Sequence, residues 1–313
     1  MSKLQVEMKW GIGAALGVAL IATVIAVVSV FAGGPPSRSS IEAKPAKTKR
    51  IGGPLLRDPR AVLLAARADD VLVGVAARAG RVELVAVPSD VKRIPARAIR
   101  VLLSGRVVGL APCGIHCFGF DARVLSGAPA FLVVEITRRG RVARAALRLP
   151  AAPPRAAGVL FRSVDRRMRG LRTVRVDEVL SSGQNSVRTR FALRAPNRMT
   201  YVTSVGDKAI VIGPRRWDWD GKAWAKSETQ PLPEPSYVWS GAERPRLLGR
   251  STVGGKPVAV LGVFNPDARY PAWFRLYVAR DNRVVRAQMF APAHFMLDRF
   301  SAFNAPLAIN PPS

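Results

Sequence analysis

Residues 187–194, with the sequence VRTRFALR, decide how the second half of the chain folds. From Val187 to Leu193 every second residue is apolar or threonine, and three of the four residues that alternate with them are arginine. Successive side chains of a β-strand point to opposite faces. This pattern therefore predicts a strand with one buried, apolar face and one solvent-exposed face. A sheet of such strands must bury its apolar face against another layer of the fold.

The segments that follow show similar short apolar runs, interrupted by turn residues. Strands are expected at 199–205 and 209–212. Asp220-Gly221 is a strong hairpin signal, and Asp281-Asn282 separates two further alternating arms. We therefore expect an antiparallel meander, with a short helix at 293–300 as its last element.

An amphipathic helix is predicted just before the meander. Its apolar residues recur at helical spacing, at Leu160, Val164, Met168 and Leu171, while charged residues fill the other side. A Pro/Ala-rich hinge at 151–157 precedes it. The apolar side of this helix is suited to pack against the apolar face of the sheet.

Several features of residues 157–310 together suggest a family. They are the amphipathic helix, a strand ending near Glu178, and the short sequences at 195–199 (APNRM), 212–213 (IG), 216–217 (RW), 273–276 (WFRL) and 289–300. This region resembles the bacterial lipoprotein carriers of the LolA and LolB group and their mycobacterial lipid-binding lipoprotein cousins. We assign residues 157–313 to such a LolA-like lipid-carrier domain.

The resemblance implies a curved antiparallel half-barrel whose concave apolar side is covered by helices. Such a cavity would hold acyl chains by burial alone, with no catalytic group and no cofactor. The residues expected to line it are Phe161, Val164, Met168, Phe191, Leu193, Tyr201, Phe274, Leu276 and Met289. The alternative is that the same residues form a closed core, because an apolar strand face has the same sequence in both cases.

A separate β module is expected at 70–150. Six or seven short apolar runs separated by turns predict a small β-sandwich. Cys113 and Cys117 flank a turn that contains His116; they are expected to form a local disulfide in an oxidising compartment, or alternatively a redox-active or copper-binding pair. The module is similar to Ig-like modules of actinobacterial exported proteins, some linked to copper-transport membrane proteins. The histidine and methionine ligands of copper carriers are not evident, and no metal site is predicted.

The N-terminal region predicts a membrane anchor. Residues 10–32 carry no charge and are long enough to span a bilayer, which places 1–9 in the cytoplasm and the body outside it, in a single-pass topology. A cleaved signal peptide is the alternative. Gly13 and Gly17 offer a small-residue face for self-association.

Residues 33–69 are expected to form a flexible basic linker that contacts anionic lipid headgroups, with a short helix at 61–68.

The net charge of +28 favours anionic partners. The basic residues are dispersed and carry no nucleic-acid motif, so nucleic acid is not expected as a partner. No nucleophile elbow, zinc-protease motif or P-loop is present, and the chain is predicted not to be an enzyme. The sequence thus predicts a membrane-anchored extracytoplasmic protein that binds a lipid or lipoprotein. The alternative is a structural or sensing envelope protein that binds a protein or polymer, with an association with copper-transport machinery as one variant.

Overall fold

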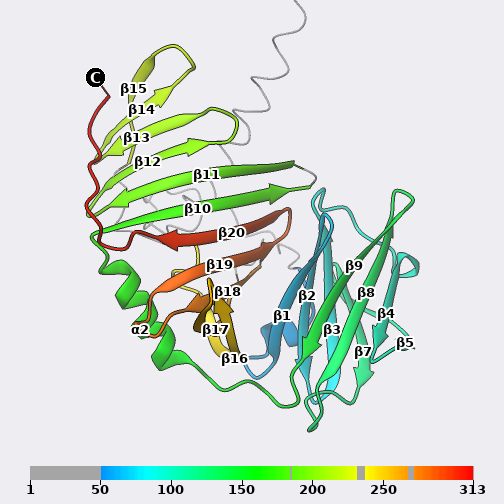
Figure 1. The fold of residues 1–313 in the computed structure, drawn as a ribbon. Coiled ribbons are helices and arrows are strands. Elements are labelled where there is room, and N and C mark those ends of the chain that lie inside the picture. Colours follow the sequence, from blue (N-terminus) through cyan, green and yellow to red (C-terminus); the bar gives the residue numbers. More distant parts are fainter. Residues whose placement is uncertain (1–50, 184, 231–236, 267–270, 313) are drawn as a thin grey trace, which may run out of the picture.

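The computed structural model describes residues 51–183, 185–230, 237–266 and 271–312. These residues form two β modules and, among them, one α-helix, α2 (Gly158–Arg169) (Figure 1). No helix in these ranges is long and apolar enough to cross a bilayer. The predicted N-terminus (1–9), the anchor (10–32) with Gly13 and Gly17, and the first part of the linker (33–50) lie outside the described residues.

The first module is a sandwich of two antiparallel sheets with strand orders β1-β2-β3-β7-β6 and β5-β4-β8-β9. Its strands are β1 (Val62–Ala68), β2 (Val71–Arg78), β3 (Gly80–Pro88), β4 (Ile99–Leu103), β5 (Arg106–Val108), β6 (Ala111–Gly114), β7 (Cys117–Ala122), β8 (Ala130–Arg138) and β9 (Arg141–Leu149). Two short 3-10 helices, η1 (Leu55–Arg57) and η2 (Ala96–Ala98), precede β1 and β4. A core that includes Leu84, Leu132 and Ile136 lies between the sheets. The expected small β-sandwich is therefore present, and its kinship with Ig-like modules stays a prediction.

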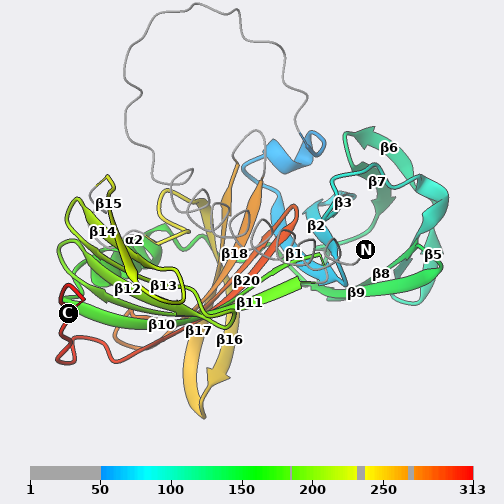
Figure 2. The same ribbon diagram turned by 90° about the horizontal axis from the view of Figure 1, so that it is seen from above.

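The second module is one antiparallel sheet of eleven strands in the order β15-β14-β13-β12-β11-β10-β20-β19-β18-β17-β16. The first meander consists of β10 (Thr173–Ser182), β11 (Asn185–Arg194), β12 (Arg198–Thr203), β13 (Lys208–Ile212), β14 (Arg215–Trp219) and β15 (Trp224–Glu228). The second consists of β16 (Glu243–Val253), β17 (Lys256–Asn265), β18 (Ala272–Val278), β19 (Val284–Ala291) and β20 (His294–Ser301). Pairing of β20 with β10 joins the two meanders, and the resulting sheet is curved and open, with α2 beside it (Figures 1 and 2).

Two predicted helices are wrong, because the structure has strands at these positions. The segment 61–68 contains β1, which pairs with β2 from Val62 to Ala68. The segment 293–300 contains β20, which lies between β10 and β19. A short apolar run does not distinguish helix from strand by its period, and here the hydrogen bonds to neighbouring strands decide. One consequence is that η1 and β1 are ordered structure inside the predicted linker 33–69. A second is that only one covering helix, rather than several, is found in the described part of the chain.

The two modules share a small apolar core. Phe264 and Trp273 of the large sheet and Phe295 of β20 pack against Ala65, Leu72, Val85 and Val87 of the sandwich. Gly74 of β2 makes this contact possible, since a Cβ there would lie 2.7 Å from Cζ2 of Trp273. The sandwich therefore covers one face of the β16–β20 end of the sheet.

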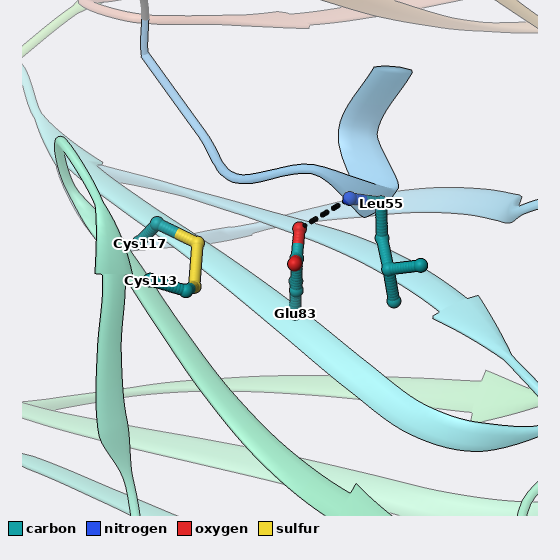
Figure 3. Close-up of a disulfide and its surroundings, with 4 residues drawn as sticks. All are labelled: Leu55, Glu83, Cys113 and Cys117. Atoms are coloured by element: carbon teal, nitrogen blue, oxygen red, sulfur yellow. Dashed lines mark hydrogen bonds between the residues drawn. A yellow bond between two sulfur atoms is a disulfide. The ribbon is translucent and has the colours of Figure 1, made fainter. Parts of the chain in front are cut away.

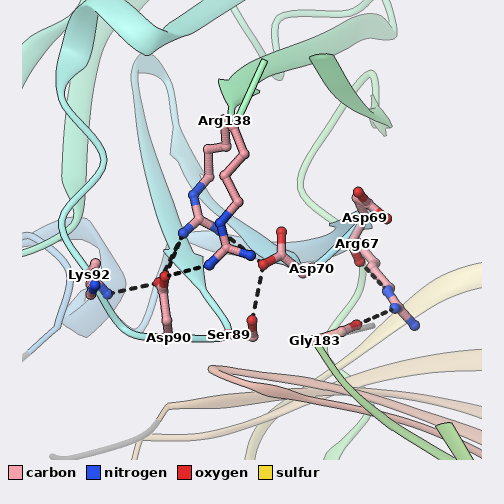
Figure 4. Close-up of polar contacts among 9 residues, drawn as sticks. Arg67, Asp69, Asp70, Ser89, Asp90, Lys92, Arg138 and Gly183 are labelled. Carbon is pink, nitrogen blue, oxygen red and sulfur yellow. Dashed lines mark hydrogen bonds and ion pairs between the residues drawn. The ribbon is translucent and has the colours of Figure 1, made fainter. Parts of the chain in front are cut away.

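Polar contacts surround the apolar core that the two modules share. Arg138 of β8 binds Asp70 at 2.9 Å and Asp90 at 2.8 Å, which ties the sandwich loops together next to the hairpin tip of β10 and β11 (Figure 4). Arg67 of β1 donates to the carbonyl oxygen of Gly183 in that tip, at 3.4 Å. From the other side, Arg244 of β16 donates to the carbonyl oxygen of Leu56 at 2.8 Å. Arginines of both modules thus satisfy backbone carbonyls across the junction.

Candidate functional site

The helix α2 supplies three of the residues that were predicted to line a cavity. Val164 and Met168 are fully buried, and Phe161 is partly buried against the same core. The thioether sulfur of Met168 accepts the backbone N–H of Val284 at 3.3 Å, and the hydroxyl of Tyr237 donates to the Met168 carbonyl at 3.2 Å. The apolar side of α2 therefore packs directly onto the sheet and onto the turn that contains Tyr237.

The other six predicted residues divide into two groups on the same sheet face. Phe274, Leu276 and Met289, on β18 and β19, are buried in the core that contains Val164 and Met168. Phe191, Leu193 and Tyr201 lie on β11 and β12, where Phe191 pairs with Tyr201 in register and their rings are 5.8 Å apart. All nine residues belong to one side of the module, and whether they line a cavity stays a prediction.

Burial on this face is uneven. Phe191 and Leu193 are only partly buried, as is Met199, which pairs with Leu193. Farther out, Ala209 and Val211 of β13 are buried on the same face, where they pair with Tyr201 and Met199. The face thus presents a partly accessible apolar strip across β11 and β12.

Two acidic residues lie at the centre of this face. Glu178 of β10 is directly opposite Asp298 of β20 in the register, among apolar neighbours such as Val176, Leu180 and Phe300. Directly opposite residues of adjacent antiparallel strands have Cβ atoms about 5 Å apart. Atoms Oε1 of Glu178 and Oδ1 of Asp298 are buried and have no hydrogen-bond partner among the described residues.

Burial determines the protonation of this pair. It raises the pKa of Glu178 to about 7 and raises the pKa of Asp298 well above its ordinary value, with the neighbouring Glu178 charge as a second cause. Two carboxylates so close in an apolar setting cannot both ionise readily, so near neutral pH the pair retains at least one proton. A protonated carboxyl group is both a donor and an acceptor for a polar group placed on this face.

A buried indole lies close to this pair. Trp239 is fully buried, stacks on Tyr237 at 4.9 Å and meets Phe300 edge-on at 5.5 Å. Phe300 is two residues from Asp298 on β20 and on the same face. Within the described ranges, the indole Nε1 of Trp239 has no hydrogen-bond partner. The apolar face therefore holds buried donors and acceptors that the chain does not pair with each other.

At the outer part of the face the polar groups are paired. Arg216 binds Asp218 through two hydrogen bonds of 2.7 and 2.6 Å and donates to the Tyr201 hydroxyl at 3.1 Å. Burial raises the pKa of Tyr201, so the hydroxyl stays neutral. Asp220 accepts the N–H groups of Lys222 and Ala223 and so supports its hairpin turn. Asp218 and Asp220 therefore have structural partners.

The cysteine pair forms a disulfide in the sandwich (Figure 3). Cys113 and Cys117 are bonded with Cα atoms 5.1 Å apart, which confirms the predicted disulfide. Glu83 lies beside the disulfide, and its Oε2 accepts the N–H of Leu55 at 2.8 Å. Ligand atoms of Glu83 and both cysteines lie within 4.8 Å of one another, but the sulfur atoms are bonded to each other and offer no thiolate. Glu83 thus tethers η1 to β3, and the disulfide joins β6 to β7.

The structure adds residues that the sequence pattern did not single out. Glu178 and Asp298 are 120 positions apart and meet only because β10 and β20 are neighbours. A charged residue in a strand is ordinarily assigned to the solvent-exposed face, so the residue type alone does not mark this pair as buried. Glu178 does break the apolar alternation of Val174, Val176 and Leu180, and this break was the available clue.

No family model matches the chain, and no curated protein matches it. Among solved structures, lipoprotein LppX from Mycobacterium tuberculosis is 15% identical, with a TM-score of 0.40 over 49% of this chain and 97% of that chain. LprF from Mycobacterium bovis is 13% identical, with a TM-score of 0.39 over 50% and 97% of the two chains. A DUF1329 family protein from Desulfovibrio piger is 10% identical, with a TM-score of 0.23 over 50% and 95%. At these values the similarities assign no function to this chain.

Proposed function

We propose that this chain is a membrane-anchored extracytoplasmic protein that binds lipid or lipoprotein acyl chains on the α2 side of its large sheet and catalyses no reaction. The observation that carries the proposal is the partly accessible apolar strip at Phe191, Leu193 and Met199, which continues the buried face under α2. Each methylene group removed from water on such a surface contributes about 0.8 kcal/mol. A chain-like ligand gains affinity there without any specific polar contact.

The polar groups on this face support the same function. A ligand with acyl chains carries an ester, amide or carboxyl group at one end of each chain. Glu178, Asp298 and the Trp239 indole are buried groups whose hydrogen bonds are incomplete. Ligand pockets are commonly apolar with a few polar groups that set the orientation of the ligand, and this arrangement is of that kind.

The test is to identify lipid bound to the purified full chain. The chain is extracted in mild detergent, and native mass spectrometry and lipid extraction are applied to it and to the double variant Phe191→Gln/Leu193→Gln. The matched control is Val202→Gln on β12, which replaces an apolar residue that is 44% exposed.

We expect a bound lipid in the parent chain and in Val202→Gln, and at least tenfold less in the double variant. A folded parent chain that carries no lipid, or a double variant that carries as much as the control, would overturn the proposal. In that case the second predicted function, a structural or sensing envelope protein, is the better one. The outward residues Arg166 and Arg167 of α2, which are exposed, favour an acidic partner for it. Crosslinking in cells would then recover a protein or polymer without lipid.

A further inference from the structure

A cleft of about 780 Å³ lies between the two modules, on the sheet face opposite α2. Strands β1 and β9 of the sandwich form one wall, and β16 to β19 form the other. Side chains alternate along these strands, so Val260, Tyr277 and Phe290 line the cleft while their neighbours Leu261, Leu276 and Met289 belong to the core under α2. The cleft is thus a separate site from the apolar strip at Phe191.

We propose that this cleft binds an anionic lipid, with the acyl chain against its apolar wall and the phosphate or carboxylate held by arginines. Four arginines line it, Arg67, Arg148, Arg250 and Arg275, and among the described residues its lining contains no aspartate or glutamate. Among the ion pairs of the described residues, none involves these four arginines. Within the part of the chain that the structure describes, these four positive charges have no counter-ion at this concave surface.

The two inner arginines are held in place. Arg275 donates to the carbonyl oxygen of Ala65 at 3.3 Å and lies 5.7 Å from the ring centre of Phe290. Arg67 lies 4.5 Å from the ring centre of Phe295 and donates to Gly183. A guanidinium has five N–H donors, so each retains donors for an anion after these contacts. Because they are already oriented, they lose little side-chain entropy when they bind.

The other two arginines add positive charge to both walls of the cleft. Arg148 of β9 and Arg250 of β16 are exposed and come from opposite walls of the cleft. Arginine recognises phosphate and carboxylate groups through paired N–H donors. The same walls carry Leu64, Leu248, Val260 and Phe290, an apolar surface that a free inorganic anion would leave unused. The volume lies within the usual range for ligand sites, which favours a small amphiphile over a protein segment.

The experiment measures lipid binding by the full chain in mild detergent, with phosphatidylglycerol, phosphatidylcholine and inorganic phosphate as probes. Native mass spectrometry gives the affinities, and a phosphatidylglycerol with a photoreactive acyl chain locates the site. The variant is Arg148→Gln/Arg250→Gln, since both residues are exposed. The control is Arg97→Gln/Arg106→Gln, which removes the same charge from two exposed arginines away from the cleft.

We expect phosphatidylglycerol to bind more tightly than phosphatidylcholine, and the cleft variant to weaken it about tenfold while the control changes it less than twofold. Crosslinks should fall in 64–67, 146–151 or 248–260. Equal binding of the two lipids, or equal loss in variant and control, would overturn the proposal. So would inorganic phosphate that displaces the lipid completely at equal concentration, because it would show a simple anion site. The variant Phe191→Gln/Leu193→Gln should leave the crosslinks in these three segments unchanged, which separates the cleft from the site of the function proposed above.

Discussion

The sandwich and the large sheet have strands of similar pattern but bury them to different extents. In β8, Leu132, Val134 and Ile136 alternate with polar or half-exposed residues and are fully buried against the facing sheet. In β11, Phe191 and Leu193 alternate with arginines in the same way and remain partly accessible. The difference lies in the covering layer, because each sheet of the sandwich is covered by the other, whereas among the described residues eleven strands share one helix of 12 residues.

Alternation therefore predicts which face of a strand is apolar, but it does not predict how completely that face is covered. Coverage is a property of the tertiary arrangement. In the large sheet the coverage comes from two sides, with α2 on one face and the sandwich on the other. The partly accessible apolar strip and the arginine-lined cleft are found where these two covers end.

The largest expected effect comes from removing the contact that joins the modules. Trp273→Ala should lower the free energy of unfolding by about 3–5 kcal/mol, since Trp273 is buried against the sandwich beside Phe264. Denaturant unfolding followed by fluorescence and circular dichroism should then show two separate transitions. Trp224→Ala, on the edge strand β15, is the control and should change stability by about 0.5 kcal/mol. A single unshifted transition in Trp273→Ala would show that the two modules do not stabilise each other.

A second pair of substitutions measures the difference in coverage directly. Leu132→Ala, in the closed sandwich core, should cost about 2–5 kcal/mol because a cavity remains between two fixed sheets. Leu193→Ala, on the partly accessible strip, should cost about 1 kcal/mol because less of its area is buried. Both values come from chemical denaturation of the full chain. Equal losses would mean that the apolar strip is as tightly packed as the core of the sandwich.

Much of the strand content could be predicted from residues such as those at 187–194, where the period of two is unambiguous. The helix α2 was also predictable, because Leu160, Val164, Met168 and Leu171 repeat at helical spacing with arginines between them. The segments β1 and β20 were missed, because their apolar runs fit a helix as well as a strand until the partner strands are known.

The sites were less predictable than the fold, for a physical reason. Glu178 and Asp298 lie opposite each other on β10 and β20, which are far apart in sequence. The four arginines that line the cleft come from four strands that are also distant in sequence: Arg67, Arg148, Arg250 and Arg275. Each arginine alone has the pattern of a solvated strand face. Only the topology places them around one concavity without acidic partners. The Cys113–Cys117 disulfide was accessible to prediction because it is local, whereas its neighbour Glu83 was not.

The smallest effect concerns the carboxyl pair, which has no counterpart in the sandwich core. Because burial raises the pKa of Glu178 from 4.5 to about 7, the folded chain keeps a proton that the unfolded chain releases at lower pH. The stability contributed by this proton is complete below about pH 4.5 and is lost as the pH rises through 7. Glu178→Gln replaces the carboxyl group with a neutral amide that needs no proton. It should therefore stabilise the chain at pH 8 by about 1–3 kcal/mol and flatten the pH dependence of unfolding between pH 4.5 and 8.

The control for this effect is Glu228→Gln, which makes the same chemical change at an exposed position of β15. Thermal unfolding at several pH values should give parallel curves for Glu228→Gln and the parent chain, and a flatter curve for Glu178→Gln. Some slope should remain in Glu178→Gln, because burial also raises the pKa of Asp298. If Glu178→Gln keeps the full slope of the parent, the carboxyl group is solvated in solution. The α2 side of the sheet would then admit water, and its apolar strip would be a wet surface rather than a site for an acyl chain.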